Sequence, residues 1–147
     1  EIIMIHFYNE DCNYNVAGKM KIRRWIEEVI RREGYVAGDI NYIFCSSEYH
    51  RQMNRDFLGH DYYTDVITFE ERDRRKEGII DGEVYIDVAT VEDNAKIYNC
   101  LPFIEMRRVI VHGALHLCGP LDKSPTAAKR MRQMENRYLK LLNTPSL

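Results

Sequence analysis

The sequence of 147 residues has no large excess of charge, no long apolar run and no closely paired cysteines. Its longest apolar run falls far short of the ~18 residues needed to span a bilayer, which excludes a membrane-spanning segment. The beginning of the sequence lacks the basic and apolar regions of a signal peptide, so we expect a cytoplasmic protein. Lysine and arginine total 21 against 23 for aspartate and glutamate, giving a net charge of −2. This balance excludes a general nucleic-acid coat protein but leaves room for a local basic patch.

The four cysteines, at positions 12, 45, 100 and 118, include no C-x-x-C pair, which argues against a disulfide framework. Cys45 and Cys118 occur in apolar segments, and we expect both to lie in the core. Apolar residues make up 45% of the sequence and charged residues 30%, a balance typical of globular proteins. Together with the length, this composition predicts a single domain over residues 1–147.

Hydrophobic periodicity and turn residues predict the element order β-α-β-α-β-β-α-α-α. The expected strands span residues 4–8, 41–45, 66–69 and 82–87. The expected helices span about 17–33, 91–98, 102–118 and about 126–142. A further short helix is expected to begin at a Ser46-Ser47 cap and to run to about residue 57. The fully charged segment 70–77 predicts a long hairpin between two antiparallel strands. The sequence thus predicts an α/β (α+β) fold, a small mixed four-stranded sheet covered by helices.

Two smaller expectations concern helix surfaces and ends. Thr90 precedes the helix expected at 91–98, and Asp93 follows it at the spacing of a capping box, so Thr90 is expected to cap that helix. His50 is expected on the exposed surface of the short helix that follows Ser46-Ser47.

The chemistry is concentrated in residues 109–122, V-I-V-H-G-A-L-H-L-C-G-P-L-D. This segment is apolar nearly all round, which predicts a core helix. His112 and His116 are four residues apart, or about 40° around a helix, so their imidazoles project from one face. Two histidines at this spacing can bind one Zn²⁺. Two hydrogen-bonded core histidines would show the same spacing, so the pair alone leaves both interpretations open.

The flanking residues favour the metal interpretation. Gly113 costs the helix about 1 kcal/mol relative to alanine, which suggests that something packs closely against it. Gly119-Pro120 reverses the chain and can bring Asp122 back beside the two imidazoles. A set of His112, His116 and Asp122 with an open fourth position is typical of a catalytic zinc ion. We therefore expect one bound Zn²⁺ on a core helix.

The segment H-G-A-L-H-L-C-G-P-L-D resembles H-G-x-L-H-L-x-G-[YH]-D-H, the signature of the YbeY family of metallo-endoribonucleases. Residues 59–69, G-H-D-Y-Y-T-D-V-I-T-F, resemble a second segment of that family, G-x-D-x-x-T-[ND]-V-L-S-F. The resemblance implies a zincin-like fold and zinc-dependent cleavage of single-stranded RNA. It also implies a role in maturation of the 3′ end of small-subunit ribosomal RNA and in ribosome quality control. The implied partners are ribosomal RNA and the small ribosomal subunit, with neither DNA nor a membrane.

The sequence departs from the family pattern at two positions. Asp122 stands where the family usually has a third histidine, and carboxylate is also an acceptable zinc ligand. Leu58 stands where the family usually has an arginine, and Arg55, one helical turn earlier, is a candidate to present a guanidinium to the same cleft. His60, in the second matched segment, is a candidate proton carrier or phosphate contact.

Two other functions remain open from the sequence. H-x-x-x-H on a helix also occurs in zinc peptidases, but Gly113 stands where such enzymes carry a glutamate as general base. A non-catalytic ribosome-associated factor with a structural metal would be compatible with the same ligands.

Overall fold

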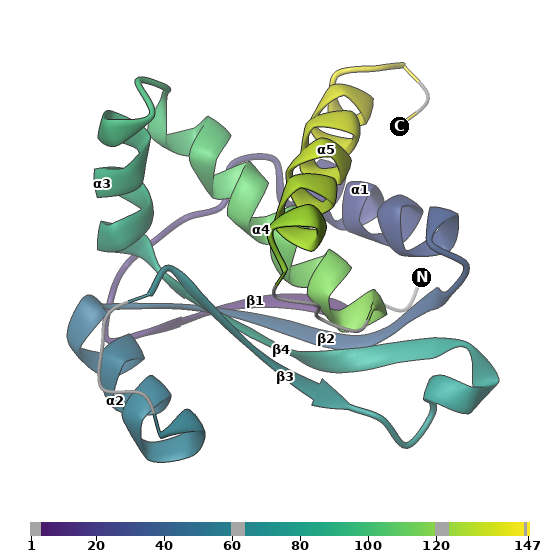
Figure 1. Cartoon of the computed structure of the whole chain (residues 1–147), viewed down its shortest axis with the longest axis horizontal. Helices are drawn as coiled ribbons and strands as arrows, with labels where there is room; N and C mark the ends of the chain where they lie inside the picture. Colours follow the sequence, from purple (N-terminus) through teal and green to yellow (C-terminus); the bar gives the residue numbers. More distant parts are fainter. Residues whose placement is uncertain (1–3, 60–63, 120–123, 146) are drawn as a thin grey trace.

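The computed structural model describes residues 4–59, 64–119, 124–145 and 147, and it confirms the predicted element order (Figure 1). The strands are β1 (Ile5–Glu10), β2 (Val36–Cys45), β3 (Val66–Glu71) and β4 (Ile79–Asp87). The helices are α1 (Lys19–Arg32), α2 (Ser47–Leu58), α3 (Val88–Ile97), α4 (Pro102–Cys118) and α5 (Pro125–Leu142), with a 3₁₀ turn η1 (Arg75–Glu77). Within the described ranges, no helix combines the length and the apolarity that crossing a membrane requires.

The four strands form one mixed sheet in the order β1-β2-β4-β3. β1, β2 and β4 are parallel, and β3 pairs antiparallel with β4 at one edge, which confirms the predicted hairpin. Helices α1, α4 and α5 lie on one side of the sheet, and α2 lies on the other (Figure 1). The structure is thus the predicted α+β arrangement of a small sheet covered by helices.

β2 and β4 are longer than their sequence patterns predict. Val36 pairs with Ile79, and the register shifts between Ala37 and Ile40. The backbone N–H of Asp39 donates a hydrogen bond of 2.7 Å to Oδ1 of Asp81 at this irregularity. Glycine and aspartate interrupt the apolar pattern near the start of each strand, so only the pairing shows that β2 begins at Val36 and β4 at Ile79.

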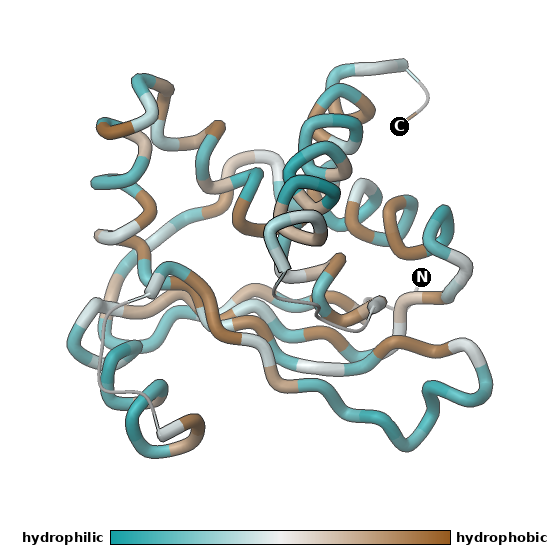
Figure 2. The backbone as a smooth tube through the Cα atoms, viewed as in Figure 1, coloured by the Kyte–Doolittle hydropathy of each residue, from teal (hydrophilic) through white to brown (hydrophobic). Residues whose placement is uncertain are grey.

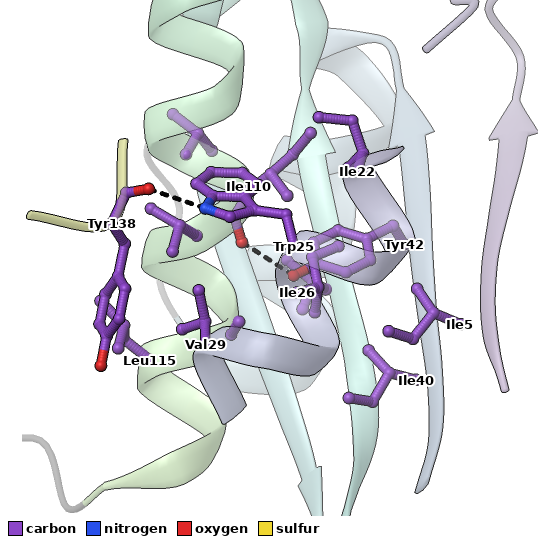
Figure 3. Packing of buried hydrophobic residues seen from close by; sticks show 14 of the residues in the cluster. Ile5, Ile22, Trp25, Ile26, Val29, Ile40, Tyr42, Ile110, Leu115 and Tyr138 are labelled. Atoms are coloured by element: carbon purple, nitrogen blue, oxygen red, sulfur yellow. Dashed lines mark hydrogen bonds between the residues drawn. The ribbon is translucent and has the colours of Figure 1, made fainter. Parts of the chain in front are cut away.

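The main core lies between the sheet and the helices on its α1 and α4 side. Trp25 of α1 is fully buried, and its Nε1–H donates a 2.7 Å hydrogen bond to the carbonyl oxygen of Tyr138 on α5 (Figure 3). Tyr42 of β2 is also buried, and its hydroxyl donates a 2.8 Å bond to the carbonyl of Ile110 on α4. Hydrophobic residues are frequent where these elements meet, whereas the β3–β4 turn is hydrophilic (Figure 2). Cys45 and Cys118 are buried, as predicted.

Helix α4 packs unusually close to β4 because glycine occurs on both elements. A Cβ atom at Gly113 would lie 2.6 Å from Cγ1 of Val84. A Cβ atom at Gly82 of β4 would lie 2.8 Å from Cδ2 of Leu117 and 2.7 Å from the carbonyl oxygen of Phe69. The close neighbour that Gly113 suggested is therefore the sheet itself. This contact sets the distance between the sheet and the segment of α4 that carries His112 and His116.

Two of the smaller expectations are wrong. α3 begins directly after β4, and the carboxylate of Asp87 caps it by accepting bonds from the backbone N–H and the hydroxyl of Thr90. His50 is fully buried rather than exposed, because α2 packs that side against β4. Its Nε2 lies 2.9 Å from the carbonyl oxygen of Tyr85.

Candidate metal centre

Helix α4 places His112 and His116 side by side, as their spacing predicts. The centroids of the two rings lie 4.6 Å apart. Both side chains line a cavity of about 640 Å³ between α4, α5, the end of α3 and the residues before β3. The two imidazoles therefore face an open space and are not enclosed in the core.

Glu135 on α5 is the closest polar partner of the histidine pair. Its Oε2 lies 2.7 Å from Nδ1 of His112, and only 5% of the residue is exposed. Because a carboxylate accepts hydrogen bonds, Nδ1–H of His112 is the donor of this contact, which favours the tautomer with a free lone pair on Nε2. Glu135 was not among the residues predicted for the site. The signal in the sequence is a carboxylate at helical spacing from Met131 and Tyr138, on the face of α5 that carries these large apolar side chains.

The guanidinium of Arg108 lies beside two buried carboxylates near the histidine pair, those of Glu135 and Glu105. Its Nη1 donates hydrogen bonds to Oε1 of Glu135, at 3.3 Å, and to Oδ1 of Asn136, at 2.9 Å. Its Nε lies 3.7 Å from Oε1 of Glu105, which is also buried. Burial raises the pKa of Glu105, and the charge of Arg108 acts in the opposite direction. Arg108 thus interacts with two buried carboxylates, and all three residues line the cavity.

His116 is held neutral by its surroundings. Burial lowers its pKa to about 4, with the nearby His112 adding to this effect and Glu135 opposing it. Its Nδ1 lies 3.3 Å from the hydroxyl oxygen of Thr68 on β3. Thr68 belongs to the second segment that resembled the family, so the fold brings the two matched segments together. At neutral pH the ring is therefore uncharged, as a metal ligand must be.

Two of the three expected zinc ligands lie among the described residues, and both are oriented as metal-binding imidazoles commonly are. Each histidine has its Nδ1 beside an oxygen, a carboxylate for His112 and a hydroxyl for His116, and metal-binding imidazoles are commonly oriented in this way. In the parts of the chain that the structure describes, neither Nε2 has a hydrogen-bond partner, and no group of three histidine, cysteine, aspartate or glutamate residues could hold a metal. Asp122, the expected third ligand, lies outside the described residues.

Of the other two candidates, only Arg55 lies among the described residues, and it does not join this cluster. Arg55 lies on α2, on the side of the sheet opposite to α4 and α5 (Figure 1), with its side chain half exposed and its Nε 3.5 Å from Oδ1 of Asp56. Arg55 is not among the residues that line the cavity. His60 lies outside the described residues. The catalytic roles of Arg55 and His60 stay predictions.

Comparisons with known proteins agree on one family. Residues 5–143 match the family model described as Endoribonuclease YbeY. A protein of that name from Cytophaga hutchinsonii is 42% identical over 137 residues, covering 93% of this chain and 94% of the relative. Another from Parabacteroides distasonis is 41% identical over 138 residues, covering 94% and 95%. The solution structure of a Thermotoga maritima protein is similar, with a TM-score of 0.63 and 28% identity, covering 95% of this chain and 89% of the other.

Proposed function

Since this chain belongs to the endoribonuclease YbeY family, we propose that it is a zinc-dependent endoribonuclease that cleaves single-stranded RNA. Its proposed role is maturation of the 3′ end of small-subunit ribosomal RNA and ribosome quality control. This role makes ribosomal RNA and the small ribosomal subunit its partners, in the cytoplasm. The observation that carries the proposal is the histidine pair beside a cavity, with His112 bonded to the buried carboxylate of Glu135.

In this proposal His112, His116 and Asp122 hold one zinc ion. When bound, zinc supplies Lewis-acid polarisation of a phosphoryl oxygen and lowers the pKa of water to ~7. Glu135 keeps the proton of His112 on Nδ1 and fixes the orientation of the ring. Arg108 in turn fixes the carboxylate of Glu135. His60 is further proposed as a proton carrier or a phosphate contact. Arg55 does not line the cavity, so any contact of its guanidinium with the RNA would lie outside the cavity.

The structure disfavours the two alternatives. A peptidase of the zincin type needs a glutamate at position 113, but Gly113 faces Val84 so closely that a side chain there requires the Val84 side chain to move. A purely structural metal is typically enclosed by four protein ligands. Here the two histidines line a cavity large enough for part of a substrate.

The test of this function is a comparison of substrates. Purified protein loaded with zinc is expected to cut unstructured RNA and to leave denatured casein intact, because phosphodiester cleavage needs no carboxylate at position 113. Removing zinc with a chelator should stop the cleavage, and adding zinc back should restore it. Raising the salt concentration should slow it, because RNA binding releases counterions. Intact RNA in the presence of zinc, or degraded casein, would contradict the proposal.

Asp122 provides a separate test of the ligand set. Asp122→Ala is expected to weaken zinc affinity, because two imidazoles alone make an incomplete site. Asp122→His is expected to retain zinc, because imidazole and carboxylate are both accepted ligands. The measurement is competition for zinc against a coloured chelator. An alanine variant that binds zinc as tightly as the unchanged chain would show that Asp122 is not a ligand.

A further inference from the structure

Tyr98 and Arg132 form an aromatic and cationic pair at the rim of the cavity. The Cζ atom of Arg132 on α5 lies 5.7 Å from the ring centroid of Tyr98, at the end of α3. About half of each is exposed, 54% of Tyr98 and 50% of the Arg132 side chain. Both residues line the same cavity as His112 and His116. Tyr98 contacts neither histidine in the described structure, and Nη1 of Arg132 lies 3.9 Å from Oε1 of Glu135, at the edge of the metal centre described above.

Backbone hydrogen bonds fix the position of Tyr98 at the end of α3. The N–H of Tyr98 donates a 2.9 Å bond to the carbonyl of Asn94, and the N–H of Cys100 donates one of 2.9 Å to the carbonyl of Ala95. Asn99 between them adopts a φ of +55°, which asparagine tolerates better than most residues. The ring therefore projects from a closed helix end, so little ordering is needed when a ligand stacks on it.

We propose that Tyr98 and Arg132 bind one unpaired nucleotide of the RNA, next to the nucleotides at the histidine pair. The Tyr98 ring stacks on the base, and the guanidinium of Arg132 contacts a phosphate. This inference rests on the proposed function and adds a binding subsite to it. The subsite favours single-stranded RNA, because a base within a duplex cannot leave its neighbours to stack on a protein ring.

The charges around the cavity favour RNA over a protein ligand. Of the acidic residues that line it, Glu105 and Glu135 are buried beside Arg108, and Glu33 accepts a hydrogen bond from the hydroxyl of Tyr138. Asp65, in the segment leading into β3, is the remaining acidic residue of the described lining. On α5, the exposed charged residues of the lining are Arg130 and Arg132. An aromatic ring beside exposed arginines suits a strand of bases and phosphates.

A second aromatic and cationic pair provides a matched control. The Cζ atom of Arg107 lies 4.9 Å from the ring centroid of Phe103, and 46% of Phe103 is exposed. Phe103 and Arg107 both belong to α4, but neither lines the cavity. Phe103→Ala therefore removes an exposed ring of the same kind without touching the proposed subsite.

The experiment measures binding by fluorescence anisotropy, with a short labelled oligouridylate and a labelled RNA duplex as probes. Tyr98→Ala is expected to weaken oligouridylate binding at least about fivefold, as loss of one stacked base predicts. Tyr98→Phe should bind like the unchanged chain, because it keeps the ring, and Phe103→Ala should do so because it lies outside the cavity. Arg132→Ala should weaken binding and reduce its dependence on salt. Duplex binding should not respond to Tyr98→Ala.

The outcomes separate this inference from the proposed function. Oligouridylate binding that is unchanged in Tyr98→Ala overturns the subsite, and so does an equal loss in Phe103→Ala, which would indicate non-specific contact with exposed apolar side chains. If the unchanged chain binds the oligouridylate and loses that binding in Tyr98→Ala but cuts no RNA, the subsite stands and the proposed function fails. Cleavage by the unchanged chain, with unaltered KM in Tyr98→Ala, would leave the proposed function standing and overturn the subsite.

Discussion

Replacing His112 by alanine is expected to abolish RNA cleavage, with at least a 100-fold loss of kcat/KM, while the chain remains folded. The variant loses one of two imidazoles that face the cavity, and with it a proposed zinc ligand. Loss of an orienting partner alone typically costs 10- to 100-fold in affinity or activity, so loss of a ligand should cost more. The measurement is the rate of cleavage of an unstructured oligonucleotide with zinc present.

Folding of the His112→Ala variant should survive for a structural reason. The buried carboxylate of Glu135 loses its bond to Nδ1 but keeps Arg108, whose Nη1 lies 3.3 Å away. Losing one such partner costs about 1–3 kcal/mol, less than the ~5–15 kcal/mol stability of a typical domain. Circular dichroism and thermal unfolding check this point. Cleavage that persists in the folded variant would indicate a contaminating nuclease, and the non-catalytic interpretation would then be favoured.

Replacing Glu135 by glutamine is expected to lower zinc affinity about 10- to 100-fold, with a parallel loss of RNA cleavage. The amide has nearly the same size and still reaches Nδ1 of His112, but it carries no charge to strengthen the hydrogen bond. The ring becomes a weaker base and is less firmly oriented. Zinc affinity is measured by competition with a coloured chelator, and cleavage at saturating zinc shows how much of the loss comes from metal binding alone.

Glu105→Gln is the matched control for Glu135→Gln. Glu105 is a buried carboxylate near the same Arg108, with Oε1 3.7 Å from its Nε, but no hydrogen bond joins it to either histidine among the described residues. The Glu105→Gln substitution removes a buried carboxylate from the same region without breaking the contact between Glu135 and His112. We expect zinc affinity close to that of the unchanged chain. Equal losses in both variants would show that overall charge, and not the bond to Nδ1, sets the affinity.

The sequence by itself determined the order of the elements, the core helix and the histidine pair. These features depend on local rules: apolar periodicity, the proline at the first turn of α4, and the spacing of His112 and His116 on one helix face. Four residues of separation fix where two side chains lie on a helix, whatever packs around it. Gly113 also signalled a close contact from the sequence alone, although its partner, Val84, could not be read there.

Only the tertiary structure decided which groups surround that pair. Glu135 reaches His112 from 23 residues away along the chain, and Thr68 reaches His116 from 48 residues away, so no local pattern joins them. The buried position of His50 depends in the same way on α2 packing against β4. Helix and strand periodicity specify which side of an element faces inward, but not which element it meets. The polar partners that orient the histidines are therefore set by the packing of α5 and β3 against α4.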